Sequence, residues 1–171
     1  GKYNISCPGL SNGEISVTPA GGNGDFVYLW KNSDMDTIKY ESLTPFSKVT
    51  DLPEGVYYLI VRDTEGCYLP DDSVQVLTLT EPDSIKFEKM NDPHAGGYDI
   101  SCFGRSDGEL DLKVTGGNTD TLANSFNWQA FDGGSGIEPT DSLQSGLTAG
   151  TYTVEVTDNW GCSGDSTFVL R

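Results

Sequence analysis

The amino-acid sequence repeats itself with a shift of 95 positions, and this duplication constrains the fold more than any other feature. The stretches Ile5–Glu14 and Leu52–Cys67 return with matching spacing at Ile100–Glu109 and Leu147–Cys162. Two copies of one frame indicate two tandem modules, each with its own core, and not one continuous enzyme fold. We expect the first module at residues 1–82, with its first strand truncated, and the second at residues 83–171.

Apolar and polar residues alternate along several short runs, a pattern typical of half-buried β-strands. Turns rich in Gly and Asn separate the runs at short, regular intervals. The predicted strands lie within residues 14–18, 26–30, 56–61 and 73–80 in the first module and 84–90, 109–115, 151–156 and 166–170 in the second. The run 26–30 is dense enough to predict a central strand buried on both sides. This pattern predicts an all-β chain of two tandem immunoglobulin-like Greek-key β-sandwich domains.

Three local features support this fold. Tyr57 and Tyr152 each follow a Gly-containing turn, as the tyrosine corner of a Greek-key sandwich does. Trp30 and Trp128 occupy the position of a core tryptophan on the third strand. The tetrapeptides 63–66 and 158–161 begin with Asp and end with Gly, which predicts type I turns in two hairpins.

Four cysteines allow three disulfide pairings. Cys7 and Cys67 lie 60 positions apart, as do Cys102 and Cys162, and each pair brackets one module. Pairing within each module is therefore the simplest prediction, and each bridge would close a loop worth about 4 kcal/mol of stability. Such bridges indicate an oxidising compartment. The alternative is four buried free thiols.

The formal net charge of −16 argues against nucleic acid and anionic membranes as partners, because both would repel the chain. No apolar run approaches the roughly 20 residues needed to span a bilayer. We therefore expect an exposed, acidic, monomeric fragment that does not insert into membranes and that has divalent cations as plausible ligands.

The sequence holds no convincing catalytic group, and we expect no enzyme activity and no catalytic residues. Its one histidine, His94, lies in a turn-like connector without a counterpart in the first module. Loop aspartates supply the oxygen ligands that calcium prefers, so Asp34, Asp36, Asp71 and Asp72 are candidate metal ligands. The alternative is that these carboxylates are simply solvated. No other cofactor is expected.

Trp160 stands in a predicted hairpin turn where the first module has Glu65. A turn tryptophan is difficult to bury in a core, so Trp160 is a candidate ligand-binding residue that would stack on sugars. The alternative is that it packs on a neighbouring loop or disulfide.

The second module contains Ser-Cys-Phe-Gly-x-Ser-Asp-Gly-x-Leu at Ser101–Leu110, and both modules contain Leu-x-x-Gly-x-Tyr. These motifs resemble the SprB repeat, a family of tandem repeats in very large surface adhesins of gliding bacteria and in related secreted proteins. The first module departs from the motif at Pro8 and Asn12 and in longer inserts. The resemblance implies a multi-repeat protein at the cell surface, exported across the outer membrane, that functions in adhesion and gliding motility.

Three functions follow as hypotheses. The first is a stalk or adhesive module whose partners are extracellular surfaces and neighbouring repeats of the same chain. The second is a calcium-dependent polysaccharide-binding module that uses the inserts 32–46 and 118–139. The third is an accessory domain of a secreted hydrolase.

Overall fold

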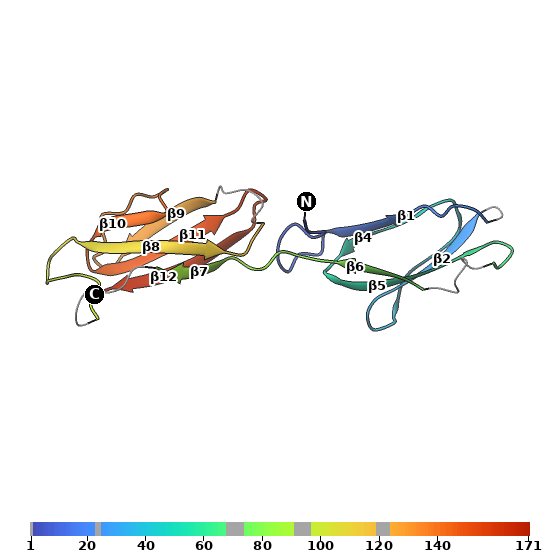
Figure 1. The fold of residues 1–171 in the computed structure, drawn as a ribbon, viewed down its shortest axis with the longest axis horizontal. Coiled ribbons are helices and arrows are strands. Elements are labelled where there is room, and N and C mark those ends of the chain that lie inside the picture. Colours follow the sequence, from blue (N-terminus) through green and yellow to red (C-terminus); the bar gives the residue numbers. More distant parts are fainter. Residues whose placement is uncertain (1, 23–24, 68–73, 91–96, 119–123) are drawn as a thin grey trace. The chain divides into compact units, whose positions relative to one another are not determined.

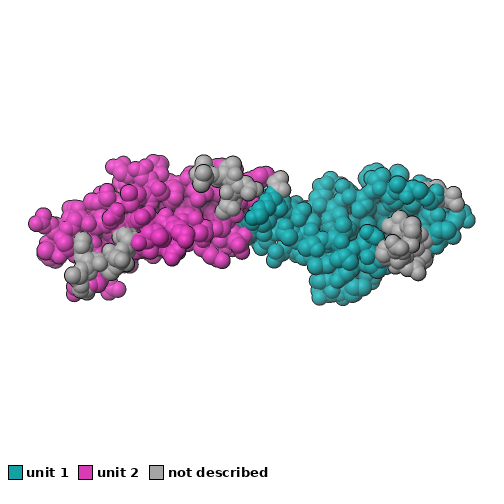
Figure 2. All heavy atoms as spheres, viewed as in Figure 1, with its two compact units in different colours: residues 1–82 teal, residues 83–171 magenta. Residues whose placement is uncertain are grey.

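The computed structural model describes residues 2–22, 25–67, 74–90, 97–118 and 124–171. The chain divides into two compact units, Gly1–Pro82 and Asp83–Arg171 (Figures 1 and 2). The described residues form twelve strands and no α-helix, which confirms the all-β prediction. We describe each unit by itself.

The first unit contains a two-stranded and a four-stranded antiparallel sheet. The small sheet pairs β1 (Gly13–Val17) with β4 (Ser47–Leu52). The large sheet has the order β3 (Thr37–Thr44), β2 (Phe26–Lys31), β5 (Gly55–Asp63), β6 (Gln75–Leu79). Because β2 and β3 belong to one sheet while β4 returns to β1 in the other, the chain crosses between the sheets as in a Greek-key sandwich.

The second unit repeats this plan and adds a strand at its start. One sheet has the order β10 (Leu143–Leu147), β8 (Gly108–Thr115), β7 (Lys86–Lys89). The other has the order β12 (Ser163–Leu170), β11 (Gly150–Thr157), β9 (Ser125–Phe131). The added strand β7 lies within the predicted run 84–90. The strand order is that of an immunoglobulin-like sandwich, with β8 and β10 facing β9, β11 and β12.

Each unit has a separate hydrophobic core between its two sheets. Trp30 and Trp128 are 0% and 2% exposed, which confirms their predicted place in the core. On β5, Tyr57, Leu59 and Val61 point inward at every second position, and Tyr152, Val154 and Val156 of β11 do the same. This alternation is the one that the sequence displays.

The strand β2 differs from its prediction. It is central in the sheet, but only alternate residues are buried, while Val27 and Leu29 on its other face are half-buried. The reason is that a two-layer sandwich covers one face of each sheet and leaves the other to solvent.

Candidate functional site

The two tyrosine corners are present in the structure and fix the turn before β5 and before β11. The Tyr57 hydroxyl donates a hydrogen bond to the carbonyl of Pro53 at 2.9 Å. The Tyr152 hydroxyl lies 2.7 Å from the carbonyl of Thr148 and 3.0 Å from both the carbonyl and the N–H of Ser135. The second corner therefore joins two loops, whereas the first holds only its own turn.

The predicted hairpin turns are also present, and each is organised by its first aspartate. Gly66 and Gly161 donate N–H groups to the carbonyls of Asp63 and Asp158 at 3.1 Å. The buried carboxylate of Asp158 accepts N–H groups from three residues at 2.8–2.9 Å, namely Asn118, Trp160 and Cys162. Burial raises the pKa of Asp158, but these hydrogen bonds outweigh burial and hold the pKa below that of an ordinary aspartate.

At the opposite end of each unit, the segment before the first cysteine is tied to the end of the last strand. In the first unit, Asn4 and Ile5 donate N–H groups to the carbonyl of Thr80, at 2.9 and 3.1 Å. In the second unit, Asp99 and Ile100 make the equivalent bonds to Arg171. Thr80 and Arg171 are therefore equivalent positions, each directly after the last strand.

The conserved spacing between the two copies of the Ser-Cys motif has a structural cause. The side chain of Asn12 accepts the N–H of Ser6 at 3.2 Å, and the side chain of Asp107 accepts the N–H of Ser101 at 3.1 Å. These bonds close the loops 6–12 and 101–107. Asn12, which departs from the family motif, thus performs the same structural task as Asp107.

The predicted cysteine pairing within each unit is wrong in this structure. Cys67 and Cys102 are free and exposed. In the first unit, Cys67 bonds to Asp63 at the end of β5, whereas Ile5, two residues before Cys7, bonds to Thr80 near Gly55, where β5 begins. The nine residues of β5 separate these ends by about 26 Å, far beyond the roughly 7 Å between Cα atoms that a disulfide allows.

The second unit repeats this separation. Cys162 bonds to Asp158 after β11, whereas Cys102 lines a cavity with Thr148 and Arg171 at the other end. Cys7 and Cys162 each take part in a disulfide. Equal sequence separation therefore identified equivalent positions in the two repeats but not bonding partners.

Two of the four candidate calcium ligands, Asp34 and Asp36, lie in one exposed turn, and calcium binding stays a prediction. The N–H groups of Asp34 and Asp36 both bond to the side-chain oxygen of Asn32, at 3.1 and 2.9 Å, and both aspartates are exposed in this turn. Asp71, Asp72 and His94 lie outside the described residues. Within the described ranges, no three His, Cys, Asp or Glu side chains form a group suited to a metal ion.

Trp160 is 56% exposed at the tip of its hairpin turn. The backbone N–H of Trp160 donates to the carboxylate of Asp158, so the backbone of the turn is fixed while the indole is available to solvent. Its role in ligand binding stays a prediction.

Two buried polar side chains that sequence reasoning missed organise the loops around the core tryptophans. Ser47 accepts the indole N–H of Trp30 at 2.8 Å and donates to Glu41. Gln144 donates to the carbonyl of Asp141, which also accepts the indole N–H of Trp128. The sequence did not predict the strand at 143–147. Its inward-facing residue Gln144 is polar, so the run lacks the regular alternation of apolar and polar residues.

The family model described as the SprB repeat matches residues 3–35 and 98–120. The matched segments begin just before the Ser-Cys loop of each unit and continue through the first sandwich strand that follows it. The SprB repeat model therefore matches one segment in each unit. The two matched segments both include the positions whose hydrogen bonds close the loops 6–12 and 101–107.

Solved structures with similar strand arrangements are distant in sequence. A C-terminal 282-residue fragment of intimin, in complex with the intimin-binding domain of the translocated intimin receptor, is 13% identical with a TM-score of 0.41; the match covers 92% of this chain and 57% of that chain. The first two immunoglobulin domains of DIP-gamma are 14% identical with a TM-score of 0.36, and the match covers 86% and 83% of the two chains. A structure of Dscam is 15% identical with a TM-score of 0.33, and the match covers 95% of this chain and 42% of that chain. The immunoglobulin-like assignment rests on the strand order of the two units themselves.

No curated protein matches the chain significantly. In the part of the chain that the structure describes, no helix is long and apolar enough to cross a bilayer.

Proposed function

We propose that the chain is a non-catalytic tandem-repeat segment of a large cell-surface adhesin, displayed outside the outer membrane, that acts as a stalk and adhesive module in surface attachment and gliding motility. The observation that carries this proposal is the match of the SprB repeat model to a segment in each of two units that have separate cores. Repetition of small self-contained units supplies length, because each unit adds its own span without rearranging its neighbours.

The second repeat has a strand arrangement suited to bearing tension. Its chain begins at Asp83, whose carbonyl accepts the N–H of Gly117 near Asp158, and it leaves at Arg171 beside Asp99. These points lie at opposite ends of β12. Tension applied at the two ends therefore acts along β7 and β12. It shears the hydrogen bonds between β7 and β8 and those between β12 and β11, so that the bonds of each pair resist the force together and not one after another.

Force spectroscopy on the reduced chain tests the stalk function. We expect two separate unfolding events, one for each repeat, and a lower unfolding force for the second repeat when the β7 ladder is weakened by Phe87→Pro, since proline removes a strand donor. Phe87 is half-buried and pairs with Val114. An exposed position on β12, Thr167→Ala, is the matched control. A single unfolding event for the whole chain would contradict the proposal.

Surface display is tested separately, by antibody labelling of an epitope-tagged full-length protein on intact cells. The proposal expects labelling without permeabilisation, together with loss of cell adhesion and of gliding when the repeats are deleted. Labelling only after permeabilisation would contradict it.

Calorimetric titration with polysaccharides, with and without a calcium chelator, distinguishes the stalk from the alternative binding module. The stalk function predicts no saturable heat under either condition. A saturable response that the chelator abolishes would assign the calcium-dependent polysaccharide-binding function instead, with Trp160→Ala as the first variant to compare.

A further inference from the structure

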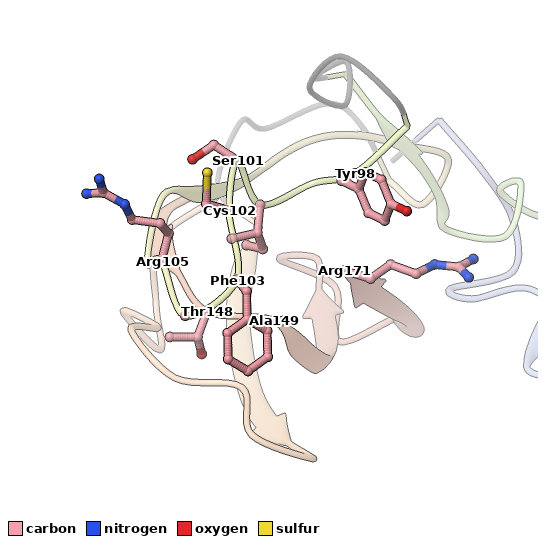
Figure 3. Close-up of a pocket in the computed structure, with 10 residues that line it drawn as sticks. Tyr98, Ser101, Cys102, Phe103, Arg105, Thr148, Ala149 and Arg171 are labelled. Atoms are coloured by element: carbon pink, nitrogen blue, oxygen red, sulfur yellow. The ribbon is translucent and has the colours of Figure 1, made fainter.

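A cavity of about 580 Å³ lies at the end of the second repeat where the Ser-Cys loop meets the end of the last strand. Its walls include Tyr98, Cys102, Phe103, Arg105, Ala149 and Arg171 (Figure 3). Phe103 is fully exposed. A phenylalanine in this state, beside a mainly apolar hollow, indicates a surface that gains stability when a partner covers it.

The first repeat shows what covers the equivalent turn. The turn Cys7–Leu10 is closed by the N–H of Leu10 bonding to Cys7, and Cys102–Arg105 is closed in the same way. Glu81 directly follows Thr80, and its carboxylate accepts the N–H of Gly9 at 2.7 Å. The residue after the last strand thus caps the turn.

The second repeat has the same donor without this acceptor. Gly104 corresponds to Gly9, and both have positive φ angles, 78° and 73°, so the two turns share one backbone conformation. Among the residues that the structure describes, none accepts the N–H of Gly104. Since Arg171 corresponds to Thr80, an acidic residue placed after Arg171 would stand where Glu81 stands in the first repeat.

The charges of the cavity suit such a residue. The chain has a net charge of −16, yet the charged residues in the cavity wall are Arg105 and Arg171. Arg105 replaces Leu10, and Phe103 replaces Pro8. The wall therefore offers cationic groups for a carboxylate and an aromatic surface for an apolar ring.

We propose that this cavity binds a Glu-Pro segment, the carboxylate accepting the N–H of Gly104 and the proline ring packing beside Phe103. The segment has the chemistry of Glu81-Pro82, in which Pro82 is buried. The inference concerns the end of a repeat and does not depend on surface display or adhesion. It makes the Ser-Cys loop the docking site of the segment that follows each repeat.

The test appends Glu-Pro-Asp-Ser, the sequence of residues 81–84, to Arg171 of the full chain and measures amide hydrogen exchange by NMR. We expect exchange at Gly104 to slow about tenfold, as a hydrogen bond to a charged acceptor implies. A matched chain ending in Gln-Pro-Asp-Ser should gain clearly less protection. Phe103→Ala in the extended chain should weaken the effect without changing exchange at Gly9.

The first repeat supplies the internal reference. Glu81→Ala should speed exchange at Gly9 by a similar factor while leaving Gly104 unchanged. Unchanged exchange at Gly104 with the Glu-Pro extension would overturn the proposal. Equal protection by the glutamate and glutamine extensions would also overturn it, because the carboxylate would then have no part in binding.

Discussion

At the residue scale, the two tyrosine corners differ in the number of hydrogen bonds that the tyrosine hydroxyl makes. Tyr57 bonds only to Pro53, whereas Tyr152 connects Thr148 with Ser135 of a second loop. Both rings are buried, with exposures of 4% and 0%. The hydroxyl of Tyr152 therefore bonds to backbone groups of two loops at a partly buried position.

Tyr152→Phe should destabilise the second repeat by about 2 kcal/mol, and Tyr57→Phe should destabilise the first by about 1 kcal/mol, because the Tyr152 hydroxyl makes more hydrogen bonds than that of Tyr57. Urea denaturation followed by the indole NMR signals of Trp128 and Trp30 reports the two repeats separately. Equal losses would show that the bonds to Ser135 contribute nothing.

Asp158 makes the second repeat sensitive to acid. Its pKa is lower in the folded state than in the unfolded state, so the unfolded chain binds the proton more readily. Its stabilising effect is complete above the ordinary aspartate pKa of about 3.9 and is lost as the pH falls through the lower folded value.

Asp158→Asn should therefore destabilise the second repeat by about 2 kcal/mol at pH 7, since charge-assisted hydrogen bonds are lost. The difference from the unmodified chain should shrink as the pH is lowered through the folded-state pKa of Asp158, which lies below the ordinary aspartate value. Denaturation monitored through Trp128 measures both conditions. A difference that does not change with pH would contradict the role given to the carboxylate.

The cysteines differ in their reactivity. Cys67 and Cys102 are free and exposed, so iodoacetamide should modify both in the folded, unreduced protein. Cys7 and Cys162 are disulfide-bonded and should react only after reduction. Peptide mass spectrometry distinguishes the four sites. Protection of Cys67 and Cys102 before reduction would restore the pairing within each repeat.

At the scale of the elements, the start of β8 depends on the absence of a side chain at Gly108. A Cβ atom there would lie 2.6 Å from Cδ1 of Ile100 and 3.0 Å from the carbonyl oxygen of Leu147. Gly13 at the start of β1 has equivalent neighbours, with Ile5 at 2.5 Å and Leu52 at 2.8 Å. The Ser-Cys loop can lie against the core only because glycine begins the strand.

Gly108→Ala should destabilise the second repeat by about 1–3 kcal/mol through overpacking. Ser106→Ala, an exposed position in the same loop, is the matched control and should change stability by less than about 0.5 kcal/mol. Thermal denaturation of the reduced protein measures both variants. A neutral Gly108→Ala variant would show that the strand shifts to accommodate the methyl group.

The sequence predicted the strands whose apolar residues alternate, such as β5 and β11, because burial of one face leaves a pattern of period two. It did not predict β3, whose residues are exposed or half-buried along the whole strand. It also missed β4 and β10, in which Ser47 and Gln144 take inward positions. Polar residues that are buried through hydrogen bonds have no signature in hydrophobic periodicity.

The same limit explains the candidate sites. Internal repetition identified the Ser-Cys loops and the Asp turns, since equivalent residues have equivalent local tasks. It did not reveal the disulfide pairing, because a repeat comparison contains no information on which end of a strand each cysteine occupies. The cavity beside Phe103 was missed for a related reason, as its parts come from loops 98–105 and 148–149 and from Arg171.

At the scale of the whole molecule, the account depends on two repeats that fold independently. Each has its own core, and the described strands of each pair only within their own unit. A unit of about 80–90 residues buries enough surface to fold by itself, although with a modest margin.

The most direct measurement compares the ¹H–¹⁵N NMR spectrum of residues 83–171 alone with that of the full chain, both reduced. We predict that the amide signals of β8, β9, β11 and β12 superimpose in the two spectra. A collapsed, poorly dispersed spectrum of the isolated segment would contradict the claim that each unit folds on its own core.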